Sequence, residues 1–223
     1  MKSRGRNCLK SGAAYEEQCH NRLKNLIIYG EIPQVADIAT SKKGTDISIT
    51  LSGKLIGFEA KNKNAFEGGS KKLEYLEDGT LGIKNDCIHK HVLQNKVIYD
   101  TSEKFPYYNN LKQLDDWKRV ESTFKPDVYF DIPPDTISGY YRSVGTHYIQ
   151  IQNRGLFHTG EDVLNIGVPL FTCECKVRIR TSKHIKNKIP TDITAAFQFN
   201  KKTLPQSPFS LDGILPAFMQ VRL

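Results

Sequence analysis

The chain lacks a long hydrophobic run. No apolar stretch approaches the roughly 20 residues that a bilayer-spanning helix needs, and the basic stretch Met1-Lys2-Ser3-Arg4-Gly5-Arg6 is not followed by the apolar core of a secretory signal. We therefore expect an intracellular protein, in the cytoplasm or at the nucleoid or nucleus, with no membrane partner.

Ordered sets of cysteine and histidine residues are also missing. An odd number of scattered cysteines indicates reduced thiols in an intracellular protein. The spacing of Cys173 and Cys175 is too short for a zinc knuckle, and no second pair accompanies them. The six histidines show no regular spacing, which gives no support to a zinc site or a nucleophilic triad. The five cysteines are Cys8, Cys19, Cys87, Cys173 and Cys175.

A glycine-rich phosphate loop is absent as well, which argues against an NTPase. What the chain does have is an excess of basic residues, 32 against 24 acidic ones, for a formal net charge of +8. Such an excess favours a polyanionic partner, and DNA or RNA fits best. With 223 residues the chain is long enough to bury a sizeable core.

A β-hairpin is predicted over residues 44–61. Residues 44–51 alternate apolar and polar side chains, Ser52-Gly53-Lys54 supplies a turn, and residues 55–61 return as a second strand. Since side chains alternate along a strand, Glu59 and Lys61 point to one face. Pairing of the two strands brings Asp46 back toward both of them.

Two carboxylates and an ammonium group would then meet at one end of a sheet. Carboxylate oxygens hold Mg²⁺, and a nearby lysine stabilises charge that develops on a phosphate. The alternative is a turn-forming Asp46 beside a solvated ion pair of Glu59 and Lys61. Ile49 and Ile56 favour a central hairpin instead, where charges are costly unless a metal or partner satisfies them.

Asp46 followed by Glu59-Ala60-Lys61 resembles the PD-(D/E)xK nuclease superfamily, which includes restriction endonucleases and archaeal-type Holliday junction resolvases. Members usually carry a glutamate on the helix before the first strand, and Glu16 or Glu17 stands in that place. The proline of the motif name is absent, since Thr45 precedes Asp46. The resemblance covers residues 12–61.

The resemblance implies an α/β fold: a restriction-endonuclease-like core with a mixed central sheet flanked by helices, and a β-rich C-terminal half. It also implies an endonuclease that hydrolyses DNA phosphodiesters with Mg²⁺, or Mn²⁺ in its place. Asp46, Glu59 and the backbone carbonyl of Ala60 would hold the ion. Lys61 would orient or help deprotonate the attacking water. Glu16 is preferred to Glu17 as a supporting or second-metal ligand, because it shares a helix side with Leu23.

The same resemblance places DNA contacts in the C-terminal half. Lys176, Arg178 and Arg180 alternate along one predicted strand face, suited to phosphates. Aromatic and basic residues interleave around Arg142 and Arg154, which suits stacking on unpaired bases but equally a tyrosine-rich sheet edge. Lys63 follows the catalytic strand. Double-strand cleavage would favour a homodimer, since a two-fold site needs two active centres.

A competing copy of the motif occurs at Asp162, Glu174 and Lys176. We rank it second because no helix with a glutamate directly precedes it, and Gly167-Val168-Pro169 interrupts the hairpin pattern. Two alternative functions stay open: a nuclease selective for junctions, flaps or single strands, and a nucleic-acid-binding module that keeps the fold without cleaving.

The predicted organisation is a basic arm over residues 1–11 and a single nuclease domain over 12–223, divided into a catalytic core (12–130) and a β-rich DNA-contacting part (131–223). The predicted helices cover 13–28, 86–99 and 110–124, and 62–82 is predicted to be a loop. Strands are predicted at 32–38, 128–132, 148–152, 156–158 and 171–179, with an irregular tail after 190.

Overall fold

The chain forms two compact units whose segments alternate along the sequence. The computed structural model describes residues 3–28, 35–40, 45–62, 67–77, 81–85, 87–93, 128–183 and 190–213. Unit 1 comprises residues 1–65, 133–172 and 201–223, and unit 2 comprises 66–132 and 173–200. The two units are interleaved because strands that follow residue 130 pair with strands that precede it or end there.

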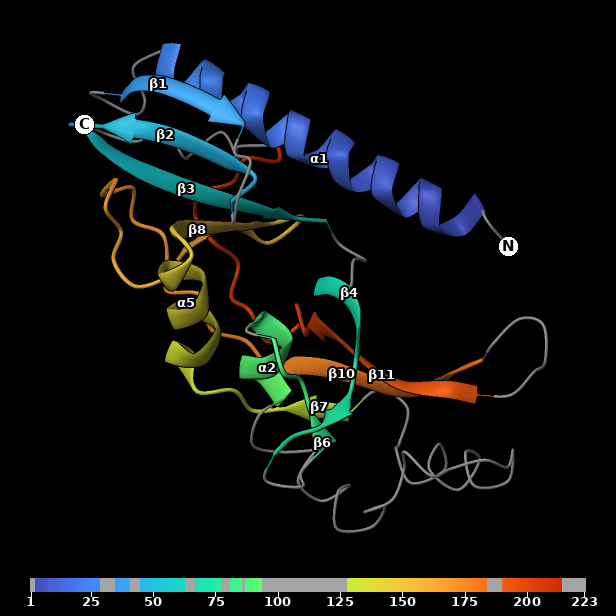
Figure 1. The fold of residues 1–223 in the computed structure, drawn as a ribbon. Coiled ribbons are helices and arrows are strands. Elements are labelled where there is room, and N and C mark those ends of the chain that lie inside the picture. Colours follow the sequence, from blue (N-terminus) through green and yellow to red (C-terminus); the bar gives the residue numbers. More distant parts are fainter. Residues whose placement is uncertain are drawn as a thin grey trace. The chain divides into compact units, whose positions relative to one another are not determined.

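Unit 1 is built on a mixed five-stranded sheet in the order β1-β2-β3-β8-β9 (Figure 1). The strands are β1 (Val35–Thr40), β2 (Ile47–Leu51), β3 (Lys54–Lys61), β8 (Thr146–Ile151) and β9 (Gly155–His158). β3 and β8 are parallel, whereas the other neighbouring pairs are antiparallel. Chain from two distant parts of the sequence thus meets in one sheet.

Helix α1 (Ser3–Ile28) covers one face of this sheet. Its residues Tyr15, Cys19, Leu23 and Leu26 follow helical spacing and are all buried. They pack in one core with the side chains of one face of β2 and β3, namely Ile47, Ile49, Ile56, Phe58 and Ala60. Helix α5 (Pro134–Ser143) packs against β8 and gives the unit its second helix.

Unit 2 contains a four-stranded antiparallel sheet in the order β4-β11-β10-β7. The strands are β4 (Glu67–Lys72), β7 (Val128–Phe130), β10 (Cys175–Lys183) and β11 (Pro190–Phe199). Helix α2 (Ile88–Leu93) packs on β4 and β11, and β5 (Glu74–Tyr75) pairs with β6 (Leu81–Gly82). Val177, Phe197 and Phe199 are buried in this unit.

The hairpin of β2 and β3, the strand pair of β8 and β9, and β7 confirm the corresponding predictions. The mixed sheet with flanking helices confirms the predicted α/β class. Other elements differ in extent: β1 begins three residues and ends two residues later than expected, and β10 begins and ends later. Of the helix predicted at 86–99, residues 88–93 are helical and 94–99 lie outside the described residues. The helix predicted at 110–124 lies wholly outside them.

Three predictions of local structure are wrong. The basic arm is helical from Ser3, since Gly5 and Gly12 weaken a helix by only about 1 kcal/mol each without ending it. The predicted loop at 62–82 contains β4, β5 and β6, of which β4 is formed by pairing with the distant β11. Residues 190–199 are a strand, so the irregular tail begins only at 200.

The strand ends before Pro133-Pro134, as predicted. Of the two interpretations left open for Tyr140, Tyr141 and Arg142, the tyrosine-rich sheet edge is wrong. Pro134 instead occupies the start of α5, where a missing N–H costs nothing because the first N–H groups of a helix have no partner within it. Tyr140, Tyr141 and Arg142 therefore belong to a helix.

Candidate active site

Asp46 lies where β2 begins, directly against β3. Its backbone N–H donates to the carbonyl of Phe58 at 2.9 Å. One carboxylate oxygen, Oδ2, accepts the backbone N–H of Ala60 at 2.8 Å. The hairpin register, with Ile47 opposite Phe58, produces this placement, because Asp46 is the next residue beyond the paired strands. The carboxylate is thus fixed beside the segment that carries Glu59 and Lys61.

Glu59 and Lys61 lie on the face of β3 opposite Phe58 and Ala60, as strand alternation requires. The ammonium group of Lys61 contacts Glu59 Oε1 directly. The side chains retain 13% (Glu59) and 16% (Lys61) of their exposure, so the pair is largely enclosed yet still reachable from solvent. The Lys61 carbonyl accepts the N–H of Gln152 at 2.9 Å, which holds this end of β3 against the end of β8.

The backbone of Ala60 faces the Asp46 side. In a strand, the N–H and C=O of one residue point toward the same neighbour. The Ala60 N–H reaches Asp46, so the Ala60 carbonyl points to the same side as that carboxylate. The predicted use of the Ala60 carbonyl as an oxygen ligand stays a prediction.

Glu16 on α1 lies in the electrostatic field of the same groups. Burial raises the pKa of its carboxyl group, the neighbouring Asp46 raises the pKa further, and Lys61 acts in the opposite direction. Glu17, the alternative, is exposed. Glu16 therefore lies within electrostatic range of Asp46 and Lys61.

The donor atoms in this region are hard oxygens, which suit Mg²⁺. In the described part of the chain, no group of three or more His, Cys, Asp or Glu side chains is placed to hold a metal ion. Magnesium does not need such a group, since it keeps several waters and is commonly held by one or two carboxylates together with substrate phosphates. Asp46 and Glu59 fit that requirement by their chemistry.

The residues predicted to contact DNA fall in both units. Arg142, at the last turn of α5, is exposed, and Arg154 lies in the turn between β8 and β9. In unit 2, Lys176 lies 5.8 Å from the centre of the Tyr129 ring, and Tyr129 is 50% exposed. Arg178 and Arg180 follow at alternating positions of β10, and Lys63 lies outside the described residues.

Asp162 and Glu174 of the competing motif each make contacts within their own unit. Asp162 accepts the Tyr148 hydroxyl at 2.7 Å and the Gly167 N–H at 2.7 Å, and so organises the loop after β9. Glu174 belongs to the other unit and accepts the side-chain amide of Asn200 at 2.8 Å. The two carboxylates therefore serve separate local structures.

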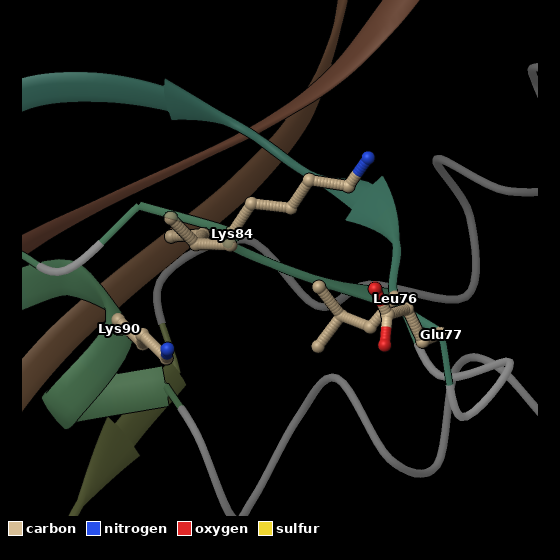
Figure 2. Close-up of a pocket in the computed structure, with 5 residues that line it drawn as sticks. Leu76, Glu77, Lys84 and Lys90 are labelled. Atoms are coloured by element: carbon tan, nitrogen blue, oxygen red, sulfur yellow. The ribbon is translucent and has the colours of Figure 1, made fainter.

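Unit 2 also contains an open pocket of about 480 Å³, lined by Leu76, Glu77, Ile83, Lys84 and Lys90. Figure 2 shows Lys84 and Lys90 reaching from different segments, with Glu77 beside Leu76. Lys84 also lies 3.7 Å from Glu74, in an exposed ion pair. Exposed pairs of this kind contribute little to stability.

One residue near the site has no signal in the sequence. Asp212 accepts the Tyr15 hydroxyl at 2.5 Å, although the two lie at opposite ends of the chain. No spacing or motif links them, because the contact arises only from the path of the C-terminal segment.

The thiols of Cys19, Cys87, Cys173 and Cys175 are free. None of the described helices is long and apolar enough to cross a membrane.

No protein-family model matches this chain, and no curated protein matches it by sequence. Among solved structures, the chain is similar to HhaI endonuclease in complex with DNA, with 12% identity and a TM-score of 0.38, over 80% of this chain and 89% of that one.

Proposed function

We propose that this protein is a divalent-metal-dependent endonuclease of restriction-endonuclease type that hydrolyses DNA phosphodiester bonds. The observation that carries the proposal is the meeting of Asp46, Glu59 and Lys61 at one end of a hairpin, with the Asp46 carboxylate fixed on the Ala60 N–H. Glu16 on α1 completes the acidic surroundings. The resemblance of these residues to the PD-(D/E)xK pattern supports the same activity.

Asp46, Glu59 and the Ala60 carbonyl would hold Mg²⁺, and Mn²⁺ would substitute for it. When bound, the ion would polarise the scissile phosphate and lower the pKa of a bound water. Lys61 would hold its ammonium group near the attacking water and near the charge that develops on the phosphate. The direct contact between Lys61 and Glu59 keeps the lysine in place before DNA arrives.

The basic residues at Lys63, Arg142, Arg154, Lys176, Arg178 and Arg180 would contact the DNA backbone. The net charge of +8 supports a polyanionic partner of this kind, and RNA is the competing one. A homodimer would be required if both strands are cut at a two-fold site.

The deciding experiment is nicking of supercoiled plasmid DNA by the wild type, with Mg²⁺ and with a chelator, alongside Lys61→Ala and a matched control. Lys54→Ala removes a lysine from the other end of the same strand, where the side chain is exposed. We expect nicking that requires the metal, loss of nicking in Lys61→Ala and full nicking in Lys54→Ala. DNA binding measured in chelator should be similar for all three.

Nicking that persists in chelator would refute the metal-dependent mechanism. Binding without nicking under every condition would favour a module that keeps the fold but does not cleave. A preference for junctions, flaps or single strands over intact duplex would favour a structure-selective nuclease instead.

A further inference from the structure

Asp212 joins the C-terminal segment to two elements of unit 1. Its Oδ1 accepts the hydroxyl of Tyr15 at 2.5 Å, and its Oδ2 accepts the backbone N–H of Asn153 at 2.7 Å. The side-chain amide of Gln18 donates to the Asp212 carbonyl at 3.0 Å. One residue therefore binds both α1 and the turn between β8 and β9.

Both contacts are made by residues that neighbour the candidate active site, either in the sequence or through one hydrogen bond. Tyr15 directly precedes Glu16 on α1. Asn153 directly follows Gln152, whose N–H donates to the Lys61 carbonyl at 2.9 Å. Asp212 thus connects the helix that carries Glu16 with the turn that holds the Lys61 end of β3.

The segment before Asp212 is itself fixed to β8. The buried side chain of Gln150 accepts the Leu211 N–H at 2.9 Å and donates to the Ser210 hydroxyl at 3.2 Å. Leu211 is buried in the core between α1 and the sheet. The position of the Asp212 carboxylate is therefore determined by hydrogen bonds and packing on the strand, not by α1 alone.

The surroundings of Cys19 show that the acidic groups gather in one place. Burial raises the pKa of this thiol to about 12, and a hydrogen bond with Tyr15 opposes the change. The carboxylates of Asp212, Asp46 and Glu16 each raise the same pKa further. All three carboxylates consequently lie near one buried group on α1.

We infer that Asp212 is a positioning residue for this site: its carboxylate fixes α1 and the turn after β8 so that Glu16 and Lys61 stay beside Asp46. The inference rests on the function proposed above. Groups that orient metal ligands typically change metal affinity or activity about 10- to 100-fold when they are removed. Asp212 makes no contact with substrate in this scheme and acts through Tyr15 and the Asn153 turn.

The chain offers a matched control in Asp162 and Tyr148. There too a tyrosine hydroxyl donates to one carboxylate oxygen, at 2.7 Å, and a backbone N–H, that of Gly167, donates to the other at 2.7 Å. Burial raises the pKa of both tyrosines, so each hydroxyl remains a donor. Asp162 organises a loop after β9 instead of α1. Removing the Asp162 carboxylate breaks a similar pair of hydrogen bonds but leaves the bonds between Asp212 and α1, the helix that carries Glu16, intact.

The experiment compares Asp212→Ala, Asp212→Asn and Asp162→Ala at a temperature where all are folded. Plasmid nicking gives kcat and KM, and a Mg²⁺ titration of the thermal unfolding midpoint gives a readout independent of cleavage. We expect Asp212→Ala to lower kcat about 10-fold or more with little change in KM, and to raise the Mg²⁺ concentration needed for the half-maximal thermal shift similarly. Asp162→Ala should leave both near the wild type.

Asp212→Asn should have a kcat and a Mg²⁺ concentration for the half-maximal thermal shift close to those of the wild type. Its carbonyl oxygen can accept the Asn153 N–H while its NH₂ donates to the Tyr15 hydroxyl oxygen, so both connections survive. Equal losses in Asp212→Ala and Asp162→Ala would overturn the inference, since only stability would then be involved. Failure of the asparagine variant to restore activity would overturn it too, because the negative charge itself would then matter.

The outcomes also separate this inference from the proposed function. If the wild type responds to Mg²⁺ but cuts no DNA, the proposed function fails and the Mg²⁺ titration alone decides the role of Asp212. If the wild type cuts DNA and Asp212→Ala behaves like it in both assays, the proposed function stands and the inference is wrong. A wild type that neither binds Mg²⁺ nor cuts DNA refutes both.

Discussion

At the scale of single residues, the environment of Glu16 makes the free energy of unfolding depend on pH. Its pKa is raised by burial and by Asp46, so the folded chain holds this proton more tightly than the unfolded chain. At pH values below the ordinary carboxyl pKa of about 4.3, both states are protonated and the group has no effect. As pH rises, the unfolded chain loses the proton first, and the free energy of unfolding falls until the folded-state pKa is passed.

We therefore expect Glu16→Gln to stabilise the metal-free protein at neutral pH and to have no such effect in acid. Added Mg²⁺ should reduce the difference, because a cation favours the charged carboxyl of the wild type. Thermal unfolding across pH, with and without Mg²⁺, measures this. Glu17→Gln is the control, since Glu17 is exposed on the same helix. Equal effects of the two substitutions would contradict the placement of Glu16.

The two copies of the motif are separated by variants of their glutamates. Glu59→Ala should abolish nicking through lost metal binding while the protein stays folded. Glu174→Ala removes the acceptor of the Asn200 amide in unit 2, so it should lower stability or DNA binding and leave some cleavage at saturating DNA. Nicking rates and unfolding midpoints of both variants provide the test. A folded, inactive Glu174→Ala beside an active Glu59→Ala would move the site to the second copy.

At the scale of elements, the parallel contact of β3 with β8 depends on a close approach at Gly57. A Cβ there would collide with the Gly145 carbonyl oxygen and the methyl group of Thr45. Gly57→Ala should therefore destabilise the protein by about 1–3 kcal/mol, as overpacking does, and reduce nicking through displacement of β3. The Gly145 oxygen belongs to the backbone, so it cannot move away as easily as the end of a flexible side chain.

Gly139, in the middle of α5, is the contrasting case to Gly57, because an added Cβ has space there. A Cβ at this position meets nothing within 4 Å, and the backbone is helical. Gly139→Ala should stabilise the protein by up to about 1 kcal/mol, since alanine favours a helix more than glycine does. Chemical denaturation of Gly57→Ala and Gly139→Ala measures whether each substitution lowers or raises the free energy of unfolding. Destabilisation by Gly139→Ala would contradict the helical placement of this segment.

At the scale of the whole molecule, the excess of basic residues predicts a salt-dependent affinity for DNA. Each phosphate that a lysine or arginine neutralises releases counterions, so the logarithm of the binding constant falls with the logarithm of salt concentration. We expect a steep fall in affinity between about 50 and 200 mM salt, measured in Ca²⁺ so that the DNA stays intact. A flat dependence would favour a protein partner over nucleic acid.

The choice of Ca²⁺ for that measurement depends on a further prediction about how the metal ion affects cleavage. Calcium binds oxygen ligands at longer and more variable distances than magnesium does, so we expect it to support DNA binding without cleavage. Mg²⁺ and Mn²⁺ should support both. Cleavage in Ca²⁺ at the rate seen in Mg²⁺ would show that the site does not depend on precise placement of the attacking water.

Local patterns in the sequence are sufficient for the hairpin and for the buried side of α1. Alternation of apolar and polar residues together with the turn at Ser52-Gly53 determines which residues face each other, so the sequence by itself groups Asp46, Glu59 and Lys61 at one end of the hairpin. The helical spacing from Tyr15 to Leu26 likewise identifies the face that is buried. These features depend on neighbours within a few residues of one another.

Tertiary structure alone decided the features that depend on distant pairing. β4 has a polar, glycine-rich sequence and is a strand because β11 lies beside it. The division into two interleaved units follows from β8 returning to β3 and β10 pairing with β7. Asp212 reaches Tyr15 because core packing and the bonds of Gln150 direct the C-terminal segment there. Contacts between such distant residues leave no periodicity in the sequence, and only the folded chain reveals them.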